Sequence, residues 1–498
     1  MPRTISARQY AHTTRTRRVS RIRNRPVRIT DVSRFDPVIV HRIIPVRTLS
    51  DIRHTLQNAT RDGRKVCVCG ARHTMGGHTL YPDAYLLDMN PLRKMYFRCA
   101  NVLRVQAGAQ WKDVIEYINT HKKAPYAMQS YCNFTVGGTA SVNAHGIREH
   151  HFADSVVSFR VITHDGTCLT CTPTENRDWF RLVLGGYGLF GVLYDIDIRV
   201  LSNVEYTANT EIVPIASFAK WYSRVSVSPP TSSTSSTSSS KAPPTPNTSP
   251  IFSVRINTNT YDTLLAVFFQ PVSTTAVKAK LRRSVGQRST YNTVQNVLFQ
   301  YVYSTRTATA LKNIMDTFRR TPLDFEYAVN GKPTTLNNIN YETTDLIAPT
   351  QQGVYTFILH ESFVPRTRYT TFVKKLKQLG TSFRFTLGLS IVNISVRVIR
   401  KDEVTFLRYA RNDSFAFVFY LKVMRSMEHV LRTFTERLND ITLQCGGTFY
   451  LPYRFHYTKK QLLQAYPNIR EFMTLKRKYD PNERFVNGFY RNLRQVMG

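Results

Sequence analysis

Acidic residues are scarce in this chain of 498 residues, because 33 Asp and Glu stand against 68 Lys and Arg and give a formal net charge of +35. Residues 1–28 contain nine arginines and no acid, yet removing them lowers the charge only to +26. The rest of the chain is therefore basic as well, and such a field favours polyanions such as nucleic acid, an anionic membrane or a phosphorylated substrate. The arginine-rich segment itself fits a nucleic-acid-binding arm, a mitochondrial presequence, or a solvated extension with no separate role.

Long apolar runs are also missing. No segment approaches the roughly 18–20 apolar residues that cross a bilayer, and the N-terminus lacks the apolar stretch of a secretory signal, so we expect neither a transmembrane segment nor export. The seven cysteines are an odd number and are scattered, which argues against a disulfide framework. These absences favour an intracellular protein in a reducing compartment, with a mitochondrial location as the alternative.

The length and the changes of texture along the chain predict more than one domain. QWKDVIEYINTH (110–121) has the spacing of an amphipathic helix, and IFSVRINTNTYDTLLAVFFQP (251–271) predicts a long strand. In chain order we expect a basic, disordered extension over 1–35, an α+β domain over 36–203, a second domain over 204–440 with a Ser/Thr/Pro-rich insertion at 228–250, and a C-terminal helical segment over 441–498.

Three glycine-bearing stretches follow strand-like segments of the first domain. They read CGARHTMGGH (69–78), TVGGTASVNAHG (135–146) and LGGYGLFGVL (184–193). Glycine lets the backbone come close to a ligand and present its N–H groups to anionic oxygens. None of the three is followed by a Walker lysine or arranged as GxGxxG, so they predict a nucleotide site of another kind.

Taken in order, these stretches resemble the FAD-binding domain of the vanillyl-alcohol oxidase/p-cresol methylhydroxylase (VAO/PCMH) superfamily. TVGGTASVNAHGIREHHFADSV is similar to its sugar-oxidising branch, which includes aldonolactone, alditol and decaprenylphosphoryl-ribose oxidases, and LKRKYDPNERFVNGFY (475–490) resembles the closing helix and turn of the family. The resemblance implies an α+β fold, with a two-subdomain PCMH-type FAD-binding domain and an α+β substrate domain built on an antiparallel sheet with helices. It implies FAD as cofactor and assigns its contacts, by position, to Gly70, Ala71, Arg72, His73, Thr74, Met75, Gly76, Gly137, Gly138, Thr139, Ser141, Val142, His145, Gly146, Gly191, Val192 and Lys459.

His73 occupies the position that carries the flavin through a histidyl bond in many members of this superfamily, and Thr74 keeps the hydroxyl of the usual serine. The resemblance thus implies covalent FAD at His73. Two alternatives stay open, non-covalent FAD and a histidine that only stabilises a turn. A zinc site made with Cys67, Cys69 and His78 is disfavoured, because the spacing matches none of the usual zinc patterns.

The second half of the chain offers candidates for the substrate side. YRFHYTK (453–459) resembles the RPHWGK motif of aldonolactone and alditol oxidases, which assigns catalytic positions to Arg454, His456 and Lys459. NISVRVI (393–399) resembles a strand on which such enzymes carry a Glu-x-Arg pair. Arg397 matches that arginine, whereas Ser395 replaces the acid. A basic surface loop and an ordinary strand are the alternative interpretations of the two motifs.

The resemblance implies an FAD-dependent oxidoreductase that oxidises a CH–OH group of a sugar, polyol or lactone-type substrate by hydride transfer to flavin N5, with oxygen or another electron acceptor completing the cycle. In that hypothesis Lys459 stabilises the reduced flavin, while His456 and Arg397 position or deprotonate the hydroxyl. The alternative hypothesis is a flavoprotein fold reused as a basic structural or nucleic-acid-binding protein, which the charge of +35 favours.

Overall fold

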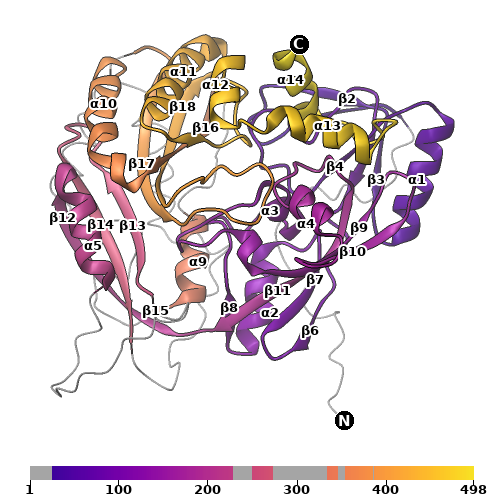
Figure 1. Cartoon of the computed structure of the whole chain (residues 1–498), viewed down its shortest axis with the longest axis horizontal. Helices are drawn as coiled ribbons and strands as arrows, with labels where there is room; N and C mark the ends of the chain where they lie inside the picture. The colour runs from indigo at the N-terminus through magenta and orange to yellow at the C-terminus, as the bar shows by residue number, and fades with distance from the viewer. Residues whose placement is uncertain (1–24, 228–248, 273–333, 346–353, 385) are drawn as a thin grey trace.

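The computed structural model describes residues 25–227, 249–272, 334–345, 354–384 and 386–498. Figure 1 shows two halves side by side, one built from the first part of the chain together with its last helices, the other built around a large sheet. Nearly all of the Ser/Thr/Pro-rich segment expected at 228–250 lies outside the described residues. Within the described residues, no helix has the length and apolar character needed to cross a membrane.

A small parallel sheet opens the first half, in the order β3 (Arg42–Pro45), β5 (Tyr85–Asp88) and β4 (Val66–Cys69). Helix α1 (Leu49–Arg61) connects β3 to β4, and it begins in a reciprocal capping box between Thr48 and Asp51. Its buried face carries Ile52, Thr55, Leu56 and Ala59. The first half therefore contains a β-α-β unit made of β3, α1 and β4.

The second sheet of this half is antiparallel and follows the order β10, β9, β11, β7, β6, with β8 paired to the end of β11. Its strands are β6 (Met95–Cys99), β7 (Val102–Gln106), β8 (Lys123–Pro125), β9 (Val156–Ile162), β10 (Cys168–Cys171) and β11 (Val192–Ser202). The helices of this region are α2 (Trp111–Thr120), α3 (Val136–Val142) and α4 (Arg177–Val183). Helix α2 coincides with the amphipathic segment predicted from sequence, and it buries Trp111, Val114, Ile115 and Ile118.

The second half is an eight-stranded sheet in the order β15, β12, β14, β13, β17, β18, β16, β19. Its strands are β12 (Glu205–Pro214), β13 (Ile251–Ile256), β14 (Thr263–Pro271), β15 (Thr334–Thr335), β16 (Tyr355–Pro365), β17 (Leu389–Ile399), β18 (Ser414–Met424) and β19 (Thr448–Phe449). All of the pairings in this sheet are antiparallel, as the fold class predicted. The single long strand expected over 251–271 is wrong, because the chain reverses between β13 and β14 at Tyr261, whose φ of 55° is left-handed.

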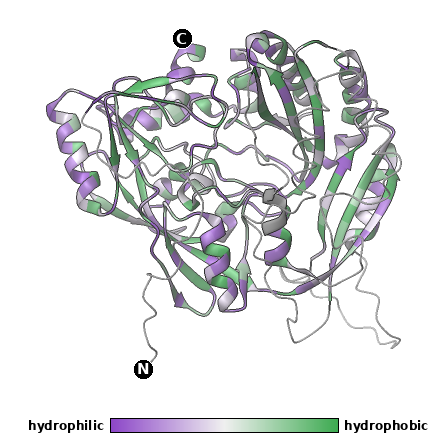
Figure 2. Cartoon of the chain, turned by 180° about the vertical axis from the view of Figure 1, so that it is seen from behind, coloured by the Kyte–Doolittle hydropathy of each residue, from purple (hydrophilic) through white to green (hydrophobic). Residues whose placement is uncertain are grey.

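Helices cover one face of the large sheet and leave the other face toward the first half. They are α5 (Phe218–Val227), α10 (Tyr369–Ser382) and α11 (Glu428–Gln444), and each follows a one-turn 3-10 helix. Side chains alternate along β18, so Phe415, Phe417 and Phe419 pack under these helices whereas Val418 faces the other way. Figure 2 shows the resulting pattern of hydrophobic strands and mixed helix surfaces.

The C-terminal segment returns to the first half. Helices α12 (Lys459–Ala465), α13 (Ile469–Tyr479) and α14 (Gly488–Met497) follow the large sheet. The segment between the last two helices lies beside the start of β4. There the Val486 N–H donates to the carbonyl of Val66, the first residue of β4, at 3.1 Å. The boundary expected between 440 and 441 lies inside α11. Helix α9 (Leu336–Asp345) follows β15 and contacts the first half, where the Asn337 amide donates to Asn119 and to the Lys123 carbonyl.

The beginning of the described chain belongs to the fold. Strand β1 (Val27–Ile29) pairs with β2 (Val38–Val40), and the buried carboxylate of Asp31 accepts a hydrogen bond of 2.7 Å from the Gly77 N–H. The expectation of a disordered extension over 1–35 is therefore wrong for 27–35. The physical reason is that these residues supply a strand partner and a buried polar contact, which a charge count does not reveal.

Candidate cofactor and substrate site

A cavity lies where the two halves meet. One side is formed by the loop after β4 and by the segment that runs from Gln129 into α3, and the other side by the open face of the large sheet. The segment from Tyr450 to Tyr453 closes it, and Val32 of the N-terminal segment also lines it. Segments far apart in sequence thus share one site, in agreement with the predicted order of a flavin part, a substrate part and a return to the flavin part.

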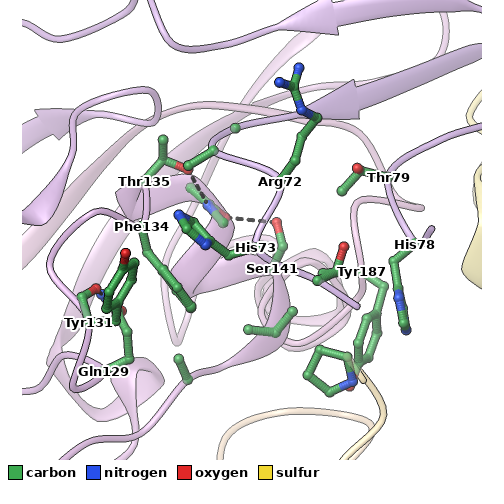
Figure 3. A pocket seen from close by; sticks show the side chains of 18 of the residues that line it. Arg72, His73, His78, Thr79, Gln129, Tyr131, Phe134, Thr135, Ser141 and Tyr187 are labelled. Carbon is green, nitrogen blue, oxygen red and sulfur yellow. Dashed lines mark hydrogen bonds between the residues drawn. The ribbon is translucent and has the colours of Figure 1, made fainter. Parts of the chain in front are cut away.

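His73 lies in this cavity on the loop after β4. Its ring stacks on Phe134, with centroids 4.6 Å apart and planes 17° apart, and Tyr131 contacts it edge-on at 5.1 Å (Figure 3). Burial, together with the neighbouring charge of Arg72, lowers the pKa of His73 to about 4. The imidazole is therefore neutral at physiological pH, which is the state in which a ring nitrogen is nucleophilic.

The first two glycine loops are packed directly against each other. Thr135 caps α3 by accepting the Gly138 N–H at 3.2 Å, and a Cβ atom at Gly70 would overlap the hydroxyl of this threonine. Gly70 therefore allows close packing of the two loops. Gly188 of the third loop, with φ +72°, has open space where its Cβ would be, and it also lines the cavity.

Most of the residues predicted to contact FAD line the cavity. They are Gly70, Ala71, Arg72, His73, Thr74, Met75, Gly137, Gly138, Ser141, Val142, His145, Gly146 and Gly191. Four others do not, and one of these is Lys459, which is described below. Thr139 is fully buried and its hydroxyl bonds Trp111 and Gln129, Val192 is buried in the core at the start of β11, and Gly76 packs against the backbone of Tyr453.

The residues predicted for the substrate side separate into two groups. Arg397 lines the cavity on the open face of the sheet. Lys459 does not, because it is the exposed first residue of α12 and its ammonium group donates to the Met497 carbonyl at 2.7 Å. Arg454 and His456 also lie outside the lining, so the terminal motif contributes no charged group to the cavity in this structure.

Arg454 and His456 belong to a polar network behind the cavity. The guanidinium of Arg454 pairs with Asp36 and Glu428 and donates to the Met75 carbonyl at 3.1 Å. His456 donates from Nε2 to Glu428 at 3.1 Å, and its Nδ1 lies 3.1 Å from the Thr435 hydroxyl. The network holds the cofactor loop and the 450–453 segment in place from outside.

Glu361 is the functional candidate that the sequence analysis missed. It lies on β16, 2% exposed, and faces the cavity together with Arg397. Its Oε1 lies 2.6 Å from His145 Nε2, and it accepts a bond of 3.4 Å from the Tyr453 hydroxyl. HESF carries no motif in sequence, and the only available signal was alternation along a predicted strand, which does not say which face lies toward a cofactor.

Several buried polar atoms around the cavity have no hydrogen-bond partner within the described part of the chain. Among them are Thr74 Oγ1, Thr79 Oγ1, His145 Nδ1 and one terminal nitrogen of Arg397. Buried polar groups are normally paired, so these atoms mark places where a bound molecule supplies partners. Together with the apolar and aromatic lining, they fit a ligand that has both a flat ring system and many acceptors, as FAD does.

The cysteines near His73 do not form part of this polar lining. Cys67 and Cys69 are buried in β4, and burial raises the pKa of Cys67 to about 12. Among the described residues there is no group of three or more His, Cys, Asp or Glu side chains placed to hold a metal ion. Thiols of this kind behave as small core residues.

Comparisons with known proteins agree with this arrangement. The family model of the FAD binding domain matches residues 40–172, and that of D-arabinono-1,4-lactone oxidase matches residues 256–493. An uncharacterized oxidoreductase of the fasciation locus of Rhodococcoides fascians is 30% identical over 167 residues, which are 33% of this chain and 37% of that protein. Cytokinin dehydrogenase 9 of Oryza sativa subsp. japonica is 27% identical over 177 residues, 33% of each chain. The chain thus spans about a third of the length of the curated relatives that it matches.

The fold has a counterpart among solved structures. A VAO-type flavoprotein of Myceliophthora thermophila C1 superposes with a TM-score of 0.62 at 15% identity, over 91% of this chain and 79% of that one. The two family matches cover both halves of the molecule, and the cavity lies between them with its cofactor loops in place. The chain therefore combines an FAD binding domain with a second half of the D-arabinono-1,4-lactone oxidase type, has the fold of a VAO-type flavoprotein, and uses FAD as its cofactor.

Proposed function

We propose that this protein oxidises a CH–OH group of a sugar, polyol or lactone-type substrate and passes the electrons to oxygen or another acceptor. The observation that carries the proposal is the buried, unpartnered guanidinium nitrogen of Arg397 on the substrate face of the cavity. Burial lowers the pKa of Arg397 to about 10, with Glu361 opposing the shift, so the group stays charged at neutral pH. A buried guanidinium group with one nitrogen that lacks a hydrogen-bond partner favours a ligand rich in oxygen acceptors.

The resemblance on the substrate side supports the same choice over a cytokinin, which the names of several relatives suggest. The lactone-oxidase match includes both Arg397 and Glu361, the charged pair on the open sheet face. The relatives named cytokinin dehydrogenase cover only about a third of the chain.

FAD, when bound, supplies a two-electron acceptor for the oxidation. The residues of the chain bind the cofactor and orient the substrate. Its glycine loops present backbone to the cofactor, and His73 holds it, covalently in our proposal. Arg397 orients the substrate oxygens, while Tyr131 and Phe134 exclude water from the cavity.

Anaerobic mixing of the FAD-loaded protein with D-arabinono-1,4-lactone, with xylitol and with a cytokinin tests the proposal. We expect the lactone or the polyol to bleach the flavin absorbance and the cytokinin to leave it unchanged. Arg397→Met should weaken the apparent affinity for the reactive probe by about 10–100-fold, because hydrogen bonds to a charged group contribute about 1.5–3 kcal/mol, whereas Arg397→Lys should lose less. Bleaching by the cytokinin alone would refute the proposal.

A basic structural or nucleic-acid-binding protein is the second candidate, and the charge of +26 outside residues 1–28 favours it. Such a role does not need a cavity lined with unpartnered polar atoms. The two functions are compatible in one chain. Retention on an RNA column that falls steeply with salt would support polyanion binding, and passage through the column at low salt would exclude it.

A further inference from the structure

The contact between His145 and Glu361 joins the two halves of the molecule at the cavity. His145 comes from the loop after α3, Glu361 comes from β16, and the two atoms His145 Nε2 and Glu361 Oε1 lie 2.6 Å apart. Their side chains are only 5% and 2% exposed. A histidine and a carboxylate that line the same cavity at this distance form the core of a proton-accepting pair.

The position of His145 is fixed from several sides. A Cβ atom at Gly146 would overlap the Met128 carbonyl, so the loop is tightly packed just after the histidine. Three aromatic rings surround the imidazole, with centroids 5.5–6.0 Å away, and they are Phe363, Tyr409 and Tyr450. Packing of this kind holds a catalytic group in one orientation.

Glu361 Oε1 has no hydrogen-bond partner of the usual geometry within the described residues, so its 2.6 Å contact with His145 Nε2 is an electrostatic one. Two lone pairs repel at such a distance, whereas a proton on the nitrogen makes the contact attractive. Glu361 therefore favours the tautomer of His145 that is protonated on Nε2. The other nitrogen, Nδ1, then has a free lone pair, and it is buried without a hydrogen-bond partner in the described residues. This is the state required of a general base.

We propose that His145 Nδ1 accepts the hydroxyl proton of the substrate and that Glu361 holds the imidazole in the required tautomer. The inference rests on the proposed oxidation of a CH–OH group. Converting that group to a carbonyl breaks a C–H bond, whose hydrogen leaves with two electrons for the FAD oxidant, and an O–H bond, whose proton passes to Nδ1. The imidazolium that results is stabilised by the carboxylate of Glu361.

The other buried histidines nearby fit this role less well. Both ring nitrogens of His456 already have partners, and the residue lies outside the cavity lining. His78 lines the cavity, but its Nε2 donates to the Leu451 carbonyl at 2.6 Å and no carboxylate contacts it. Burial lowers the pKa of His78 to about 3, which makes it a weak proton acceptor.

The test compares His145→Asn and Glu361→Gln with a matched control, His360→Asn. His360 precedes Glu361 on β16, is 3% exposed, and does not line the cavity. In anaerobic single-turnover mixing with D-arabinono-1,4-lactone, both test variants should bleach the flavin about 10²–10⁴-fold more slowly, the range of general-base catalysis. The control should keep the wild-type rate per bound FAD.

Binding supplies a second readout that does not depend on turnover. The dissociation constant of the lactone, read from its perturbation of the oxidised flavin spectrum under conditions too brief for reduction, should change far less than the bleaching rate in both test variants, because the lost proton transfer belongs to the chemical step. A substitution that only disturbs the walls of the cavity would weaken binding as strongly as it slows bleaching.

The outcomes separate the two proposals. If the wild type is bleached by no lactone or polyol, the proposed function fails and this inference falls with it. If the wild type reacts and His145→Asn reacts equally fast, or loses as much lactone affinity as bleaching rate, only the inference is overturned. Glu361→Gln has nearly the same shape as the native residue, so it tests the pair even if the histidine variant loses FAD.

Discussion

Ser395 of β17 and Glu361 of β16 both pair with Val418 on the strand between them. The three residues line the cavity at the same level of the sheet. The acid that sugar-oxidising relatives carry at the position of Ser395 is thus matched by a carboxylate two strands away, about 9–10 Å across the sheet at the usual strand spacing. Moving the carboxylate to that strand also brings it into contact with His145.

Exchanging the side chains of Ser395 and Glu361 separates two roles of the carboxylate, which are to balance the charge of Arg397 and to position His145. Glu361→Ser should lower the free energy of unfolding by about 3 kcal/mol, because Arg397 loses a buried counter-charge. Adding Ser395→Glu should restore much of this stability, since residue 395 is two positions from Arg397 on the same face. It should not restore the rate of flavin bleaching, because His145 stays without its carboxylate. Urea unfolding and anaerobic mixing measure the two effects, and equal recovery of both would contradict the assignment.

The bond between His73 and FAD can be tested by precipitation. We expect the wild-type protein, denatured in acid, to keep its yellow colour in the pellet. His73→Ala should release the flavin to the supernatant while still binding it before denaturation, because the remaining loop residues keep their contacts. Colour released from the wild type would leave FAD as the cofactor and remove the covalent bond.

Arg454 should be important for stability rather than for the chemical step. Arg454→Met breaks two ion pairs and a bond to the Met75 carbonyl. Because Asp36 and Glu428 are partly exposed, we expect a loss on the order of 2–3 kcal/mol, below that of a fully buried pair. Arg494→Met is the control, since its ion pair with Glu483 is exposed and should contribute less than about 1 kcal/mol. Urea unfolding checks both values, and equal losses would contradict the network.

Stability should decline in acid because several histidines are buried in their neutral form, and the pKa is lowered most at His78 and His360. Burial lowers the pKa values of His78 and His360 to about 3, whereas a histidine in the unfolded chain titrates near 6.5. The unfolded state therefore binds more protons below that pH, and the free energy of unfolding should fall by about 1.4 kcal/mol per pH unit for each histidine as pH drops from 6.5 toward 4.

The control for this pH dependence is His360→Asn, which removes one of these histidines. Its unfolding free energy, measured in urea at several pH values, should fall less steeply than that of the wild type, by the contribution of one histidine. An unchanged slope would show that His360 is already protonated in the folded protein. At neutral pH the variant should differ from the wild type only through lost packing.

The sequence was informative wherever local patterns decide the structure. Helix α2 and the β-α-β start follow from apolar periodicity, and the glycine loops led to the FAD site through resemblance. What failed depended on contacts between distant segments. His456 and Lys459 of the terminal motif lie outside the cavity lining, whereas Glu361 is part of it. Strand register and the return path of the chain determine these positions. Neither of them can be inferred from the periodicity of apolar residues.

The walls of the cavity come from Val32 near the start, from the loop after β4, from the large sheet and from Tyr453 near the end. A site of this kind exists only after nearly the whole chain has reached its native arrangement. Retained flavin is therefore a report on the folding of the entire molecule. A fragment of either half should be colourless however well it folds, and the ratio of flavin to protein absorbance in any preparation measures the fraction of molecules whose two halves have come together.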